Sequence, residues 1–399
     1  MKLPVSRIRS GRLLVMSAAL SLVALALLLG SALAGSGAVM SSRAACASPT
    51  ETRVSFRSES NTLSGILSLP EGGGRHAAVV LLSGSDRGGT TSPYLVLHAR
   101  FLVRSGFAVL RYDPPGVGRS TGDHRFETLD DRAREAIAAL DYLRTRPELR
   151  RDEIGLWGHS QGGWVTQMAA AASKHVAFIV SVSGSGVSPA EQEVYSVEAQ
   201  SRTAGFSAPD VAKAALFSRL WIDWQLARPV YREQNLARVR RLGPGPWKAF
   251  AALVYRPGSL TPAQNLARGI AILQSIRHEL FARYLYLDTA ILPALEAIRP
   301  DQVAAAKAAA QQSLLVTPKK YLSAVHCPVL AIWGEDDVLV PARKSATLYR
   351  QYLKAAGNRD VTIVVFPNTG HSINDAAGND FSPAYRTTLT RWLKHGFNK

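Results

Sequence analysis

Short apolar runs alternate with longer amphipathic stretches along most of this chain. The apolar runs have the length and composition of buried strands, and they occupy residues 77–82, 107–112, 153–157, 176–183, 328–333 and 361–366. Helical spacing fills residues 94–105, 129–144 and 164–172 between them. This alternation predicts an α/β fold, with a mostly parallel central sheet, right-handed crossovers and helices on both faces.

Two further segments depart from this rhythm. Near the start, two runs at 53–58 and 63–69 alternate apolar with polar residues around a polar turn, which predicts a β-hairpin. Residues 188–320 hold no convincing strand but show helical periods at 211–228, 265–289 and 291–310, with a Gly-Pro-Gly-Pro break at 243–246. We therefore expect one α/β core in two parts, 53–187 and 321–399, separated by a helical insertion. The alternative is a helical extension packed elsewhere on the core.

Composition is compatible with this plan, and only the charge adds to it. A chain of 399 residues that is 47% hydrophobic can form one large α/β domain with an insertion. The formal net charge is +17. A basic surface can bind nucleic acid, but no helix-turn-helix, RNP or zinc-finger pattern accompanies it. We therefore expect no nucleic-acid partner. We interpret the positive charge as a consequence of a composition biased towards arginine and alanine.

The first residues have the pattern of an export signal. Basic residues precede an apolar stretch at 13–29, and small-x-small sites follow at 32–34 and 45–47. We interpret 1–34 as a signal peptide, 35–52 as a linker, and the protein as exported, either periplasmic or secreted. The apolar stretch is also long enough to span a bilayer, so an uncleaved anchor with membrane association is the alternative.

Cysteine usage predicts neither a metal site nor a disulfide framework. The two cysteines are Cys46, in the predicted linker, and Cys327, at the start of an expected core strand. No Cys/His spacing resembles a zinc site. We expect Cys327 to pack as a small apolar residue, with a Cys46–Cys327 bridge as the weaker alternative.

A candidate catalytic motif lies at the junction between an expected strand and an expected helix. Residues 157–163 read Trp-Gly-His-Ser-Gln-Gly-Gly, and this strand–turn–helix context is that of a nucleophile elbow. A side chain at Gly158 or Gly162 would collide with the backbone of such a turn, whereas Ser160 would project from its tip. Gln161 is the first residue of the expected helix. Its unpaired backbone N–H and the helix dipole can stabilise a developing negative charge. A second Gly-x-Ser-x-Gly around Ser120 lies in a polar run, which favours a loop.

Two more strands end at ionisable residues. Asp337 follows the strand at 328–333, and His371 follows the strand at 361–366. Ligands bind at this carboxyl edge of open parallel sheets. A serine hydroxyl needs a base to take its proton and an acid to orient that base, and the chain order Ser160, Asp337, His371 is that of α/β-hydrolases. Asp336 remains an alternative acid, and Glu335 has the character of a solvated turn. His159 is expected to shape the elbow or line the pocket, and the other histidines to be surface or packing residues.

With these residues in view, the chain resembles an α/β-hydrolase of the bacterial exported esterase and serine-aminopeptidase-like (dienelactone-hydrolase-like) kind. The likeness also rests on Ser83-Gly84-Ser85-Asp86, similar to the family's oxyanion loop, and on the segment 110–122. It implies Ser85 and Gln161 as the oxyanion N–H donors. It also implies Asp337 as the acid, from the Gly-x-x-Asp-x-x-Val-Pro spacing that begins at Gly334. The resemblance covers roughly 55–190 and 320–399, and it places a helical lid over the site at 188–320.

The expected function is hydrolysis of a small acyl compound, above all an ester, through an acyl-enzyme that needs no cofactor or metal. Amides, thioesters and acyl transfer use the same machinery. A non-catalytic binding protein on this fold is the alternative from another class. Aromatic residues of the insertion are expected either to line the substrate pocket or to pack, and they are Trp221, Trp224, Trp247, Tyr255, Tyr284 and Tyr286.

Overall fold

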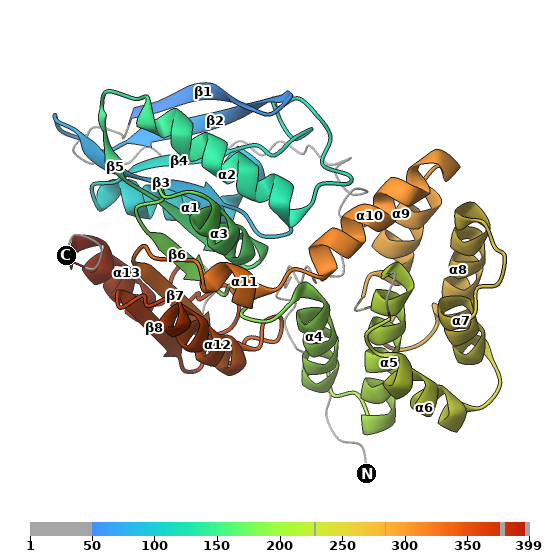
Figure 1. Ribbon diagram of the computed structural model, residues 1–399. Coiled ribbons are helices and arrows are strands. Elements are labelled where there is room, and N and C mark those ends of the chain that lie inside the picture. The colour runs from blue at the N-terminus through green and yellow to red at the C-terminus, as the bar shows by residue number, and fades with distance from the viewer. Residues whose placement is uncertain (1–49, 227–228, 284, 376–379, 396–399) are drawn as a thin grey trace, which may run out of the picture.

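The computed structural model describes residues 50–226, 229–283, 285–375 and 380–395 (Figure 1). The predicted signal peptide, most of the predicted linker and Cys46 lie outside these ranges. No helix within them is both long and apolar enough to span a bilayer.

An eight-stranded sheet forms the centre of the molecule, in the order β1-β2-β4-β3-β5-β6-β7-β8. The strands β3 to β8 are parallel, because each crossover returns through a helix. The antiparallel β1–β2 hairpin joins this sheet through β2 and β4. The strand bounds are β1 Thr50–Ser58, β2 Asn61–Leu69, β3 His76–Leu82, β4 Ala108–Tyr112, β5 Leu149–His159, β6 Ile179–Val182, β7 Val329–Gly334 and β8 Val361–Phe366. All the predicted strands are present, and β1 takes in residues 50–52 of the predicted linker.

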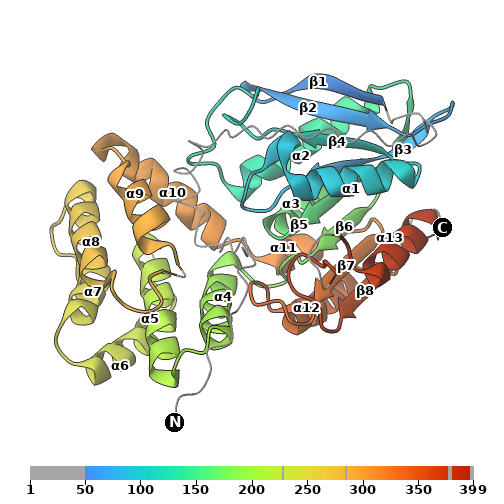
Figure 2. The same ribbon diagram turned by 180° about the vertical axis from the view of Figure 1, so that it is seen from behind.

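Helices cover both faces of the sheet (Figures 1 and 2). The apolar sides of α1 (Pro93–Arg104) and α13 (Pro383–His395) pack on one face. On the other face lie α2 (Leu129–Arg144), α3 (Gln161–Ala172), α11 (Pro318–Leu322) and α12 (Ala342–Ala355). The predicted fold class is confirmed. Its physical basis is the near-continuous burial of the central strands, which are apolar on both faces.

Residues 188–320 form helices, as expected. They are α4 Pro189–Thr203, α5 Ala208–Gln225, α6 Arg232–Leu242, α7 Pro246–Tyr255, α8 Pro262–Ile276, α9 Leu292–Glu296 and α10 Val303–Leu314. The period at 211–228 corresponds to α5, and the other two are interrupted. The helix expected at 265–289 ends at Ile276. The one expected at 291–310 is broken at Pro300, because a residue before proline is pushed out of the helical conformation, and Arg299 is extended.

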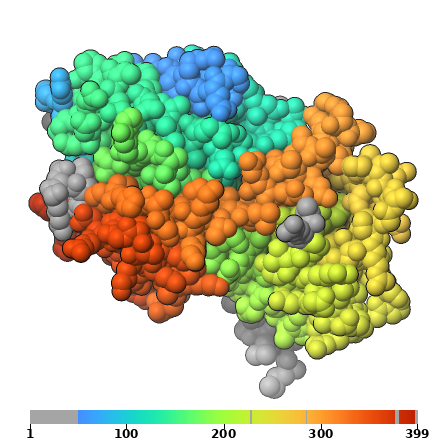
Figure 3. Space-filling view, viewed as in Figure 1, coloured from blue at the N-terminus to red at the C-terminus, as the bar shows by residue number. Residues whose placement is uncertain are grey.

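The insertion has an apolar core of its own. Residues of α5, α7, α8 and α9, among them Phe217, Trp221 and Phe250, pack together apart from the two clusters that flank the sheet. In the ribbon views these helices stand to one side of the sheet, and only α4 and α10 approach the core (Figures 1 and 2). The space-filling view shows the insertion abutting the core along this side (Figure 3).

Candidate active site

Ser160 sits at a strained turn between β5 and α3. Its backbone has φ 54° and ψ −118°, values that a residue with a side chain rarely adopts. A Cβ on Gly158 would lie 2.2 Å from the carbonyl oxygen of Gly162, and one on Gly162 would lie 2.6 Å from that of Leu82. Gly158 is therefore required for the turn to close and Gly162 for the turn to pack against the end of β3. The turn leaves Ser160 beyond the end of β5.

The second Gly-x-Ser-x-Gly has a different surrounding. The Ser120 hydroxyl donates to the carbonyl oxygen of Asp113 at 2.6 Å and accepts from the N–H of Ser64 at 2.9 Å. Ser120 is buried and ties the loop after β4 to β2. Its hydroxyl is thus committed to holding two segments together.

Asp337 and His371 are brought together at the ends of β7 and β8. The Nδ1 of His371 lies 2.8 Å from Oδ2 of Asp337. An ionised carboxylate can only accept, so Nδ1 carries the proton and Nε2 is left as an acceptor. The other oxygen of Asp337 accepts from the N–H groups of Leu339 and Val340 at 2.8 and 2.9 Å. Asp337 is 1% exposed, whereas Asp336 is exposed and Glu335 pairs with Arg343.

The loop that carries His371 is fastened from three sides. The carbonyl oxygen of His371 accepts from the Ser183 hydroxyl at 2.7 Å and from Nε2 of His159 at 3.2 Å. The Tyr94 hydroxyl donates to the carbonyl of Ser372 at 3.0 Å. Burial, and secondly the neighbouring His371, hold the pKa of His159 well below its usual value. A neutral His159 therefore positions His371 from within the elbow.

One cavity of about 190 Å³ joins these groups. Ser160, His371 and the segment 83–86 line it, together with Tyr94, His159 and Leu339. The segment 83–86 lies against the elbow, since a Cβ on Gly84 would lie 3.4 Å from Cβ of Ser160. Among the hydrogen bonds between described residues, none is donated by the N–H of Ser85 or of Gln161. Both remain available to a ligand at this place.

Arg132 of α2 connects the two loops that carry these N–H groups, and the sequence did not single it out. It is 5% exposed. Its Nη2 donates to the carbonyl of Ser83 at 2.7 Å, and its Nη1 donates to the side-chain oxygen of Gln161. One guanidinium therefore fixes the segment 83–86 relative to the start of α3. Its planar set of donors is suited to holding two acceptors at once.

Further buried charges surround Arg132. Burial raises the pKa of Glu135 to about 7 and also raises the pKa of Asp86, and Arg132 opposes both shifts. Burial lowers the pKa of Arg87 to about 9, and Arg87 pairs with Glu127. This charge cluster therefore includes Asp86 of the segment 83–86 itself. Nothing in the sequence indicates that these charges meet, because Arg132 and Glu135 belong to a helix patterned as amphipathic.

The insertion reaches the candidate site at one point. The Tyr195 hydroxyl of α4 donates to the carbonyl oxygen of Asp337 at 2.8 Å. None of the residues that line the Ser160 cavity comes from the described part of 188–320. The described part of the insertion therefore contacts Asp337 without lining the Ser160 cavity, and the lid over that cavity stays a prediction.

The aromatic residues proposed for the substrate pocket have other places. Trp221 and Trp224 line a separate cavity within the insertion. Trp247 is buried in the insertion's own core, and the Tyr255 hydroxyl donates to the buried Asp223 at 2.6 Å. Tyr286 lines a surface hollow formed by residues 277–280, 282–283 and 286–289. Tyr284 lies outside the described residues.

Two smaller expectations concern cysteine and metals. Cys327 is a free thiol packed at the edge of the core, and burial raises its pKa to about 12. In the part of the chain that the structure describes, no cluster of His, Cys, Asp or Glu could hold a metal ion.

Comparison with known proteins agrees with this fold. The sequence model of the alpha/beta hydrolase family matches residues 79–383. The chain belongs to this family. The match begins in β3 and ends in α13, so it spans the elbow, the insertion and the ends of β7 and β8 that bear the candidate site residues.

Individual relatives match this alpha/beta hydrolase over shorter segments. An uncharacterized protein of Pseudomonas aeruginosa is 32% identical over 122 residues, which cover 30% of this chain and 32% of that protein. A polyketide transferase of Penicillium crustosum is 29% identical over 161 residues, 38% of this chain and 49% of the transferase. The chain thus spans a third to a half of the length of these curated relatives.

The fold of this hydrolase is also found in solved structures. An esterase of Pyrococcus furiosus superposes with a TM-score of 0.50 at 15% identity, covering 88% of this chain and 92% of the esterase. At this identity the likeness concerns the fold alone.

Proposed function

We propose that this protein is a serine hydrolase that cleaves the acyl bond of a small carboxylic ester. The observation that carries the proposal is the 2.8 Å contact of Asp337 with His371, which lines the same cavity as Ser160 at its strained turn. Membership of the alpha/beta hydrolase family supports a hydrolytic reaction. The exported-esterase and serine-aminopeptidase-like subtype is part of the proposal.

The proposed reaction has two halves. Nε2 of His371 takes the proton of the Ser160 hydroxyl while the oxygen attacks the ester carbonyl, and the imidazolium then gives that proton to the leaving alcohol. Water, deprotonated by the same Nε2, releases the acid from the acyl-enzyme. Asp337 keeps the proton on Nδ1 and stabilises the imidazolium. The N–H groups of Leu339 and Val340 keep that carboxylate in place.

The tetrahedral intermediate needs donors aimed at its oxyanion. We assign this role to the N–H groups of Gln161 and Ser85, which donate to no acceptor within the described chain. Gln161 lies at the N-terminus of α3, where the helix dipole favours negative charge. The loop of Ser85 reaches the same place because it packs on the elbow.

The cavity size favours a short acyl group, because about 190 Å³ is below the usual range for drug-sized ligands, roughly 300–1,000 Å³. Acyl transfer to an acceptor other than water is the second candidate, favoured by the match to a polyketide transferase. The two differ only in the nucleophile that attacks the acyl-enzyme.

The test uses two serines with the same local motif. We expect Ser160→Ala to abolish hydrolysis of p-nitrophenyl esters and covalent labelling by a fluorophosphonate, whereas Ser120→Ala keeps both in the folded protein. Adding short alcohols to the wild-type assay separates hydrolysis from transfer, because a transferase forms the new ester in preference to the acid. Labelling lost in Ser120→Ala but kept in Ser160→Ala would refute the nucleophile assignment.

We also propose that residues 1–34 direct export and that the enzyme acts outside the cytoplasm. The basis is the basic, apolar and small-residue order of this segment. N-terminal sequencing of the native protein should find a start at Gly35 or near Ser48. An intact start combined with carbonate-resistant membrane binding would instead identify the segment as an anchor.

A further inference from the structure

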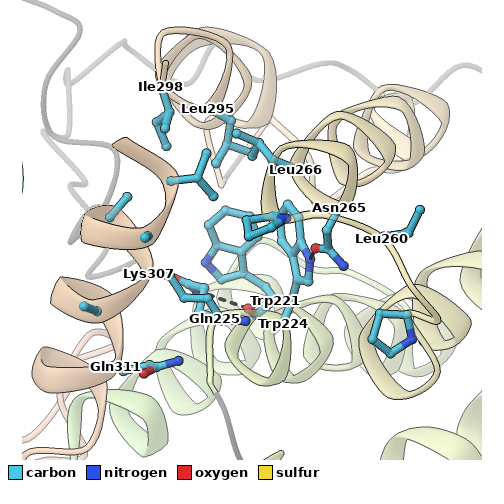
Figure 4. Close-up of a pocket in the computed structure, with 16 residues that line it drawn as sticks. Trp221, Trp224, Gln225, Leu260, Asn265, Leu266, Leu295, Ile298, Lys307 and Gln311 are labelled. Carbon is cyan, nitrogen blue, oxygen red and sulfur yellow. Dashed lines mark hydrogen bonds between the residues drawn. The ribbon is translucent and has the colours of Figure 1, made fainter. Parts of the chain in front are cut away.

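A second cavity, of about 440 Å³, lies wholly within the insertion (Figure 4). Its walls come from α5, α8, α10, the end of the α9 region and the α7–α8 connection. It shares no lining residue with the Ser160 cavity. Its volume falls within the range of small-molecule sites, roughly 300–1,000 Å³. Neither the proposed reaction nor the packing of the insertion accounts for it.

Two indoles form a fixed wall of this cavity. The ring centroids of Trp221 and Trp224 are 5.6 Å apart, and Nε1 of Trp224 donates to Oδ1 of Asn265 at 2.7 Å. The Trp224 ring lies directly on Gly269 in the middle of α8, where a Cβ would come within 2.1 Å of it. Glycine inside a helix costs about 1 kcal/mol relative to alanine. Here it provides the room for the indole, so the wall is held in place before any ligand arrives.

The opposite wall is a stripe of α10. Ala304, Lys307, Ala308 and Gln311 are spaced three and four residues apart, so they share one helix face, and all four line the cavity. The alanine side chains are too short to fill the space between the helices. Lys307 is the one cation among the described lining residues, and no carboxylate is among them. The wall thus combines an apolar surface with an uncompensated positive charge.

We propose that this cavity is a second binding site, for a carboxylate that carries an apolar chain. The chain would lie between the indoles and the alanine stripe, with Leu266 and Leu295 beside it. The carboxylate would pair with Lys307, and the carboxamide of Gln311, one turn further along the stripe, can donate to it. Lys307 is exposed, so the charge selects the head group, while covering the apolar lining supplies most of the affinity. The inference is independent of the reaction assigned to Ser160.

The test is calorimetric titration of the full chain with decanoate at pH 8, with decanol as the uncharged probe. Ala308→Phe fills the cavity and is expected to weaken decanoate binding at least tenfold. Ala305→Phe is the matched control, since Ala305 lies on the same helix but does not line the cavity, and it should bind as the wild type does. Lys307→Gln should weaken decanoate roughly fivefold, the order expected for an exposed ion pair, and leave decanol unchanged. Thermal unfolding shows that each variant is folded.

Each outcome decides a part of the proposal. Absence of decanoate binding to the wild type, or equal binding by Ala308→Phe and Ala305→Phe, would overturn the site. Equal loss of decanoate and decanol in Lys307→Gln would overturn the assignment of the head group to Lys307.

Discussion

The carboxyl edge of the sheet and the helical insertion are built by different means. At the edge, Ser160, Asp337 and His371 lie in the short loops that follow three of the strands, so the hydrogen-bonded order of β5, β6, β7 and β8 brings them together. In the insertion, helices meet only through side-chain packing around their own apolar cluster. The two regions contribute to the site very differently. The core supplies every residue that lines its cavity, mostly from this edge, whereas the described part of the insertion supplies a hydrogen bond from Tyr195.

This difference shows which sequence patterns predict the position of a residue in space and which do not. A strand in a parallel sheet has a fixed neighbour distance and a fixed direction, so a motif just past its end has a known position. A helical period shows which face is apolar but not which partner covers it. The comparison leads to an experimental rule: changes at the edge should alter the chemistry, and changes in the insertion should alter stability.

After removal of the Ser160 hydroxyl, the largest effect is expected for the acid. Asp337→Asn presents an amide in place of the carboxylate that fixes the His371 tautomer, so kcat should fall by roughly 10³–10⁴. Asp336→Asn is the control, because Asp336 is exposed beside it, and kcat should stay within about twofold of wild type. Steady-state hydrolysis of a p-nitrophenyl ester measures both. Similar losses in the two variants would show that the spacing from Gly334 does not identify the acid.

The insertion should instead respond in stability and with pH. Glu193 of α4 is 4% exposed, and burial raises its pKa to about 8 from an ordinary 4.5. The folded state therefore binds this proton more tightly than the unfolded state does. Its contribution is favourable at low pH and is lost as pH rises from about 4.5 through about 8. Glu193→Gln removes this loss, so the free energy of unfolding at pH 8.5 should rise relative to pH 5 by on the order of 3 kcal/mol against wild type.

The measurement is urea unfolding of both proteins at the two pH values, with ester hydrolysis recorded alongside. Glu198→Gln on the same helix is the control, since Glu198 pairs with Arg202 near the surface, and its pH profile should follow the wild type. If kcat changed in Glu193→Gln while stability did not, α4 would act on the chemistry. The rule that changes in the insertion alter stability would then be wrong.

Much of the core could be predicted because local and global signals agree there. The strand runs, the Gly-x-Ser-x-Gly turn and the two strand-end residues all rest on short-range patterns, and the structure places them as expected. The insertion was predicted less well. Pro300 interrupts an apolar period that continues on both sides of it. The start of α4 was overlooked, although Ser188 caps it and Pro189 occupies its first turn.

Within the site, the residues that could not be predicted are those that hold the candidate catalytic loops in place. Ser183 and Tyr94 hold the loop of His371 by long-range contacts that no spacing reveals. Arg132 belongs to an amphipathic helix rich in charge, and such an arginine reads as solvent-facing. Only the packing of α2 against α3 and the segment 83–86 turns it inward.

The smallest expected effect at the edge of the sheet tests Arg132 as a positioning residue. Arg132→Met keeps the bulk of the side chain and removes both donors, so the segment 83–86 and Gln161 lose their common support. The proposed oxyanion donors would then be displaced by a fraction of an ångström, which should lower kcat about 10–100-fold, less than deleting a donor outright. KM should change little, because the loss is felt in the transition state.

Arg132→Lys should restore part of kcat with one donor group, and Arg134→Met, on the exposed face of the same helix, should have no effect. A parallel fall in the rate of fluorophosphonate labelling, with thermal unfolding unchanged from wild type, distinguishes positioning from a general loss of fold. If Arg132→Met remained folded with wild-type kcat, the segment 83–86 would be held in place without it, and the edge of the sheet would not depend on this helix.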